Sequence, residues 1–167
     1  MSGHRNGKND VEDGLKNWLL NAQKVVVAGI GNPLRKDDFV GVEIVRSLQD
    51  QVSPSVYLLE CETVPESFLE SIIEFKPTHI LILDAARLNR KPGSSNLIEP
   101  SQMLKYPPIS THTLPLRVFC EYLAKTTNAK IALLLIQPED TSFGEGLTQK
   151  IGETATTVTA LLLVTLP

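Results

Sequence analysis

The stretch Val25-Val-Val-Ala-Gly-Ile-Gly-Asn-Pro-Leu-Arg-Lys-Asp-Asp-Phe-Val-Gly41 decides the fold, because an apolar run breaks into a glycine-containing turn, two adjacent acids and a helical pattern. The β-branched run 25–30 is typical of a strand that is buried on both faces. A strand, a tight loop and a helix in this order predict the first unit of a parallel sheet. The loop of such a unit lies at the carboxyl edge of the sheet, where open α/β folds bind ligands.

Strands and helices alternate along the rest of the chain. Ahead of the stretch, apolar residues from Val11 to Ala22 recur at helical spacing, with Asn9 or Asp10 as the expected N-cap. The periodicity predicts helices at 40–48, from Pro65, from residue 110 and from Leu147, and strands at 56–59, 79–84, 96–99 and 130–136. This alternation predicts a single α/β/α sandwich.

Composition excludes several classes of protein. The chain has 167 residues, of which 42% are hydrophobic and 21% charged, which suits one buried core. The net charge of -3, without a Lys/Arg-rich run, argues against a nucleic-acid partner. The N-terminus lacks an apolar signal region, and the apolar tail 160–166 is too short to span a bilayer. We therefore expect a cytoplasmic protein without a membrane partner.

Covalent acyl-enzyme chemistry lacks a nucleophile in this sequence. Cys61 and Cys120 lie far apart and neither has a convincing histidine partner, so both are expected to be buried free thiols. No G-x-S-x-G motif is present. A dinucleotide site is also disfavoured, because the third glycine of G-x-G-x-x-G would stand at position 34, which is Leu.

Three polar side chains are expected to converge at the carboxyl edge. Asp38 follows the first strand, Asp84 ends the strand 79–84, and His112 precedes the helix after the next crossover. The first and third strands are commonly neighbours where the winding of a parallel sheet reverses. Two carboxylates and an imidazole make a divalent metal site with open positions for water or substrate.

Each of these residues also has a simpler structural interpretation. Asp37 or Asp38 could cap a helix and favour its dipole. Asp84 could bind a loop backbone, and His112 could be a satisfied polar residue or a cap. His79 begins a strand at the opposite edge and is interpreted as structural.

Several motifs resemble the [NiFe]-hydrogenase maturation endopeptidases. The motifs are Gly29-Ile-Gly-Asn-Pro-Leu-Arg-Lys-Asp-Asp38 with Gly41, Leu83-Asp-Ala85, Pro92-Gly93 and Ile109-Ser-Thr-His-Thr-Leu114. Thr63-Val-Pro-Glu66 and Ile136-Gln-Pro138 further resemble the formate-hydrogenlyase (hydrogenase 3) branch. The similarity covers about residues 24 to 165, so 1–23 resembles an N-terminal extension ahead of a single α/β protease domain at 24–167.

The resemblance implies a fold, an activity and a site. The fold is a three-layer α/β/α sandwich of phosphorylase/hydrolase type. Its twisted, mostly parallel sheet has five strands in the order second, first, third, fifth, fourth, and the fourth strand is antiparallel. The activity is that of an aspartyl-type endopeptidase that removes a C-terminal extension from a hydrogenase large-subunit precursor. Asp38, Asp84 and His112 would contact nickel, which the precursor carries and the resting enzyme does not hold.

Two departures from the family pattern occur beside the expected site. Phe39 follows the acidic pair where the family usually has glycine, and Glu60-Cys-Glu-Thr63 replaces a glycine-containing loop. Glu62 could supplement the metal site, narrow the choice of partner or only be solvated. Two alternative functions also stay open, namely a metal-dependent hydrolase of small substrates and a non-catalytic metallochaperone or docking module.

Overall fold

A five-stranded sheet forms the centre of the computed structural model, which describes residues 7–105 and 113–167. The strands are β1 (Val25–Ile30), β2 (Val56–Glu62), β3 (His79–Ala85), β4 (Ser95–Ile98) and β5 (Lys130–Ile136). The α-helices are α1 (Gly7–Trp18), α2 (Val40–Leu48), α3 (Leu69–Phe75), α4 (Thr113–Thr127) and α5 (Gln149–Thr165). Short 3-10 helices are η1 (Lys36–Phe39), η2 (Pro65–Phe68) and η3 (Pro100–Lys105).

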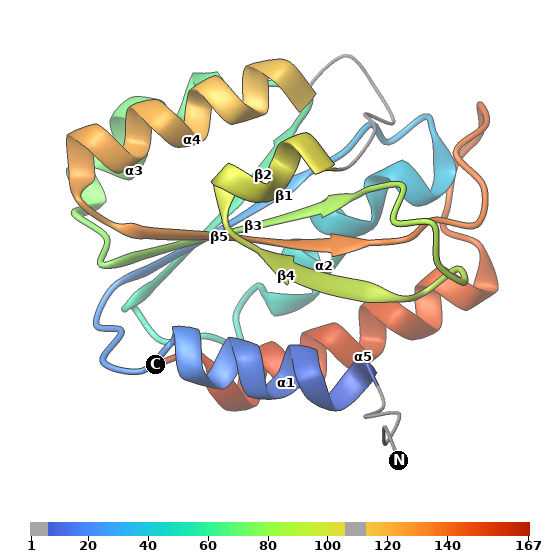
Figure 1. The fold of residues 1–167 in the computed structure, drawn as a ribbon, viewed down its shortest axis with the longest axis horizontal. Coiled ribbons are helices and arrows are strands. Elements are labelled where there is room, and N and C mark those ends of the chain that lie inside the picture. Colours follow the sequence, from blue (N-terminus) through green and yellow to red (C-terminus); the bar gives the residue numbers. More distant parts are fainter. Residues whose placement is uncertain (1–6, 106–112) are drawn as a thin grey trace.

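The sheet order is β2-β1-β3-β5-β4, with β4 antiparallel to β5 and the other pairs parallel. Figure 1 shows α3 and α4 on one face of the sheet and α1, α2 and α5 on the other. The predicted three-layer sandwich, strand order and antiparallel fourth strand are therefore confirmed.

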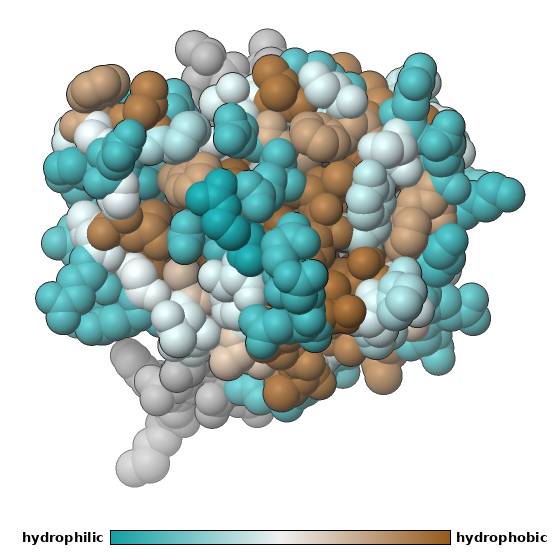
Figure 2. All heavy atoms as spheres, turned by 180° about the vertical axis from the view of Figure 1, so that it is seen from behind, coloured by the Kyte–Doolittle hydropathy of each residue, from teal (hydrophilic) through white to brown (hydrophobic). Residues whose placement is uncertain are grey.

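Two hydrophobic clusters, one on each face of the sheet, make up the core. Because side chains alternate along a strand, Val25 and Val27 face the cluster under α1, α2 and α5, and Val26 and Ala28 face the cluster under α3 and α4. All six residues of β1 are buried, as expected for a central parallel strand. Seen from behind, hydrophobic and hydrophilic residues alternate over the surface, including the middle of this face (Figure 2).

The structure corrects several expected boundaries. The strands expected at 79–84 and 96–99 are His79–Ala85 and Ser95–Ile98. The α-helices expected from Pro65 and Leu147 begin at Leu69, after η2, and at Gln149. The first helix begins at Gly7, so Asn9 and Asp10 lie inside it and neither is the N-cap. The second strand continues to Glu62, because β2 pairs with β1 through an irregularity near Ile30 that keeps its polar end in the sheet. Helix α1 shares the core of the domain, with Leu15 fully buried in the cluster that α2 and α5 also cover.

The first turn of α2 lies against the backbone of β3. At Gly41 an added Cβ atom would meet the carbonyl oxygen of Leu83 at 2.1 Å, a distance that no side chain permits. Only glycine allows this approach, which sets the start of α2 beside the carboxyl end of β3. Gly29 and Gly31 of the opening stretch lie equally close to other backbone atoms, so the glycines of this stretch serve close packing.

We predict that Gly41→Ala lowers the free energy of unfolding by about 2 kcal/mol or more, because the new methyl group has to push two backbone segments apart. Denaturant unfolding followed by circular dichroism measures this change. The matched control is Gly152→Ala in α5, where an added Cβ meets nothing within 4 Å. The control is expected to gain up to about 1 kcal/mol of stability. Equal stability of both variants would contradict the packing argument.

Candidate active site

Asp38 lies at the carboxyl end of β1, in the 3-10 turn η1. Gly31, with φ +149°, makes this tight turn possible, because a Cβ atom added at Gly31 would lie only 2.0 Å from the carbonyl oxygen of Asp38. The side chain is 1% exposed, and its Oδ2 accepts a hydrogen bond from the Asn32 N–H at 2.9 Å. Its Oδ1 is buried and has no hydrogen-bond partner among residues 7–105 and 113–167. One oxygen thus fixes the carboxylate, and the other is left for a ligand.

Asp84 lies at the carboxyl end of the neighbouring strand, β3. It is 5% exposed, and its Oδ1 accepts the N–H of Ala85 at 2.9 Å. This bond is to the next residue of β3 itself, and not to the loop backbone that the simpler interpretation expected. Because β1 and β3 are adjacent and parallel, with Gly29 opposite Leu83, Asp38 and Asp84 follow neighbouring strand ends.

The third predicted residue, His112, lies outside the described residues. Within the part of the chain that the structure describes, no group of three or more His, Cys, Asp and Glu side chains could hold a metal ion. The metal site formed by Asp38, Asp84 and His112 stays a prediction that requires the imidazole.

Asp37 has a different task from its neighbour. Its carboxylate is fully buried and accepts N–H groups of Glu139 at 3.0 Å, Asp140 at 2.9 Å and Thr148 at 2.8 Å. The hydroxyl of Thr148, at the N-cap position of α5, donates to the same carboxylate at 2.9 Å. Asp37 therefore ties the turn after β1 to the loop after β5.

Neither acid caps a helix. The N-cap positions of η1 and α2 are Arg35 and Phe39, and neither helix has a side-chain cap hydrogen bond. The capping alternative is therefore wrong for both residues. Sequence reasoning missed the clamp of Asp37, because its partners follow more than a hundred residues later and no local pattern marks them.

The two departures from the family pattern line one groove of about 560 Å³. The ring of Phe39 lies under the guanidinium of Arg46, with 5.2 Å between Cζ and the ring centroid. Arg46 in turn pairs with Glu60 at 2.8 Å. Glu62 is exposed at the groove, and its carbonyl accepts the N–H of Gly31 at 2.8 Å.

The two thiols and His79 are buried side chains outside the predicted set of Asp38, Asp84 and His112. Cys61 and Cys120 are free and buried, as expected, and burial raises the pKa of each thiol to about 12, with smaller contributions from Glu66 and Glu121. His79 begins β3 at the amino end of the sheet, and burial lowers its pKa. Its ring packs edge-on against the ring of Trp18, with 5.0 Å between the ring centroids, which fits the interpretation of His79 as structural.

Buried carboxylates at the carboxyl edge of a largely parallel sheet are typical of an α/β enzyme. A family profile described as HycI, hydrogenase maturation protease, matches residues 42–164. The chain therefore belongs to the hydrogenase maturation protease family, and its activity class is that of an endopeptidase.

Individual relatives agree with the family. A Methanocaldococcus jannaschii protein named as a hydrogenase maturation protease is 39% identical over 137 residues, which cover 77% of this chain and 80% of that protein. The hydrogenase 3 maturation protease of Escherichia coli is 27% identical over 133 residues, which cover 80% of this chain and 85% of that protein. The crystal structure of a [NiFe] hydrogenase maturation protease HycI from Thermococcus kodakarensis superposes with a TM-score of 0.84 at 32% identity. That superposition covers 92% of this chain and 98% of the other.

One structural observation bears on the membrane. Among residues 7–105 and 113–167, no helix is both long and apolar enough to cross a bilayer.

We predict that Asp37→Asn lowers the free energy of unfolding by about 2–3 kcal/mol, since the new amide group faces backbone N–H donors that the carboxylate accepted. Denaturant unfolding at neutral pH measures this loss. The matched control is the isosteric Asp38→Asn, whose amide oxygen can still accept the N–H of Asn32. Equal losses in the two variants would contradict the separation of roles.

We also predict that thiol alkylation at pH 8 leaves the native protein unlabelled and its activity unchanged. Both thiols are buried, and their pKa of about 12 keeps them protonated far above this pH. Mass spectrometry after iodoacetamide treatment measures the labelling, and treatment of the unfolded protein is the control. Rapid labelling of either cysteine in the native state would refute the assignment.

Proposed function

We propose that this chain removes the C-terminal extension from a [NiFe]-hydrogenase large-subunit precursor, and that nickel already held by the precursor licenses the cleavage. The observation that carries the proposal is the pair Asp38 and Asp84 at adjacent strand ends in a member of the maturation protease family. The names of the relatives supply the substrate class.

The chemistry of Asp38 supports an encounter with a metal that another protein brings. Among the described residues the buried Oδ1 of Asp38 has no hydrogen-bond partner, and a buried polar atom in that position favours a ligand that arrives later. Two carboxylates and one imidazole form a moderate, incomplete donor set. Such a set suits the sampling of nickel that the partner still coordinates. His112 enters this set from the sequence resemblance.

Two routes to peptide cleavage are available to these residues. In the first, the nickel polarises the scissile carbonyl or activates a water molecule. In the second, nickel serves recognition, and a carboxylate acts as the general base toward water. In both routes Asp38 and Asp84 have to be ionised, and the turn at Gly31 has to hold Asp38 in place.

We predict that the purified protein shortens a nickel-loaded precursor and leaves the nickel-free precursor intact. Asp38→Asn should reduce the cleavage rate by about 100-fold or more, because the amide can neither serve as a base nor bind nickel well. Denaturing electrophoresis and mass spectrometry of the precursor measure the product. Asp13→Asn, which changes an exposed carboxylate of α1, is the matched control and should cleave like the parent.

The other outcomes of this cleavage experiment would each contradict a part of the proposal or favour an alternative function. Equal cleavage of the nickel-free precursor would refute nickel licensing, and cleavage retained by His112→Ala would refute the role of the imidazole. A nickel-loaded precursor that binds but is never shortened would favour the metallochaperone or docking alternative. Hydrolysis of small substrates alone would favour the small-substrate hydrolase.

A further inference from the structure

Two exposed apolar side chains project from one paired loop beside Asp38. Leu34 is 44% exposed and Phe143 is 82% exposed. Their segments are joined by backbone hydrogen bonds from Gly144 N to Leu34 O at 2.8 Å and from Lys36 N to Gly144 O at 3.0 Å. We call residues 34–36 and 142–144 together the lip.

Side-chain contacts hold the lip in a fixed shape. The Nζ of Lys36 lies 2.8 Å from the Oδ2 of Asp140, and this hydrogen bond holds the pKa of the Asp140 carboxyl below its usual range. The Nε of Arg35 donates to the carbonyl of Thr141 at 3.1 Å. The buried carboxylate of Asp37 accepts two backbone N–H groups of the same loop. A surface fixed in this way loses little conformational entropy when it binds a partner.

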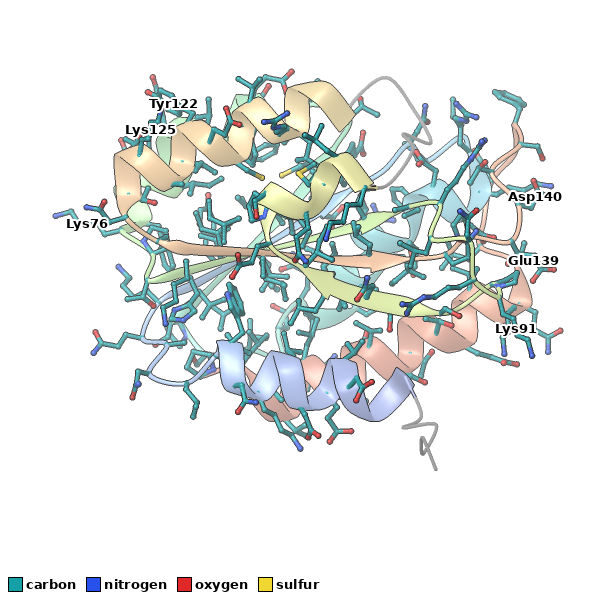
Figure 3. The ribbon with its side chains drawn as sticks, in the orientation of Figure 1. Lys76, Lys91, Tyr122, Lys125, Glu139 and Asp140 are labelled. Carbon is teal, nitrogen blue, oxygen red and sulfur yellow. The ribbon has the colours of Figure 1, made fainter. Side chains whose placement is uncertain are left out.

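The lip is continuous with the candidate active site. The N–H of Asp38 donates to the carbonyl of Arg35 at 3.0 Å, so Asp38, whose Oδ1 has no partner within 7–105 and 113–167, is bonded directly to the lip. Figure 3 shows Glu139 and Asp140 at the end of the molecule opposite Lys76 and Lys125. The lip therefore stands at the carboxyl edge, where a substrate has to approach.

Single exposed apolar residues are common and need no explanation. The lip differs because an aromatic side chain is held out by a braced loop, next to a candidate catalytic carboxylate. Of the charged side chains of the lip, Lys36 pairs with Asp140, and Arg35 donates its Nε to the carbonyl of Thr141, so the lip offers its partner apolar contact together with the positive charge of Arg35. Rigid aromatic anchors of this kind often carry most of the energy of a protein interface.

We propose that the lip is a docking surface for the folded large-subunit precursor, and that Phe143 and Leu34 enter an apolar depression of the precursor near its scissile segment. This inference rests on the proposed function. It adds the surface by which the enzyme holds its protein substrate, separately from the metal and the cleaved bond. The proposal requires an apolar, concave surface on the large-subunit precursor.

Phe143→Ser and Leu34→Ser test the proposal with the nickel-loaded precursor. Phe143→Ser should raise the KM at least tenfold while kcat at saturating precursor stays within about twofold, because the lip binds substrate without touching the reacting atoms. The dissociation constant, measured in the Asp38→Asn background so that precursor is not consumed, should rise by the same factor. Val164→Ser, which removes another exposed apolar side chain (78% exposed) at the end of α5, is the matched control.

The outcomes separate this inference from the proposed function. Unchanged KM and binding in Phe143→Ser, with normal cleavage by the parent, would overturn the lip and leave the function standing. Weaker binding of Phe143→Ser to a precursor that the parent binds but never cleaves would support the lip and overturn the function. Absence of any binding by the parent would overturn both. A dimer of the parent in gel filtration that Phe143→Ser dissociates would overturn the lip, since its occupant would then be a second copy of the chain.

Discussion

The buried carboxylate of Asp37 is the constraint on which the carboxyl edge depends. A charge removed from water is tolerated only where hydrogen bonds replace its hydration. Asp37 meets this requirement with backbone N–H groups of Glu139, Asp140 and Thr148 together with the hydroxyl of Thr148. The carboxylate therefore fixes the turn after β1, the loop after β5 and the start of α5 relative to one another. This cluster supports the lip and the turn of Asp38, which Gly31, Asn32 and the Lys36–Asp140 pair also hold in place.

The two adjacent aspartates of η1 thus differ in how fully their carboxylates are hydrogen-bonded. The side chain of Asp37 is saturated with donors and holds the loops together. The side chain of Asp38 accepts the Asn32 N–H through one oxygen and keeps the other oxygen without a partner among the described residues. Because the hydrogen bonds of Asp37 hold the loops together, the carboxylate of Asp38 can make fewer hydrogen bonds without loosening the turn. An under-bonded group next to a rigid support is the usual design of a preorganised site.

Sequence alone predicted the elements whose signals are local. The ranges of β1, β5 and α2 follow directly from apolar runs and helical spacing, and the structure reproduces them. The polar end of β2 was missed, because pairing with β1 overrides the loop-like composition of residues 60–62. The clamp of Asp37 was missed for a similar reason, since its partners are brought near only by the complete fold. Structure that depends on contacts between segments far apart in the sequence leaves no periodic pattern, so it cannot be predicted from the spacing of apolar residues.

The departures from the family pattern make physical sense when they are considered together. A phenylalanine in a position usually taken by glycine adds a large apolar ring at the mouth of the site, and that ring needs a cover. Arg46 of α2 supplies the cover, and Glu60 of β2 holds the guanidinium over the ring. Phe39 and Glu62 line the same groove, so both departures change the shape and charge of one surface. The groove is lined by residues of α2 and also by residues 145–147 of the loop after β5, directly after the lip in the sequence. Phe39 and Glu62 therefore change the shape and charge of a groove that lies beside the turn of Asp38, and the pairing of Arg46 with Glu60 keeps the ring of Phe39 covered there.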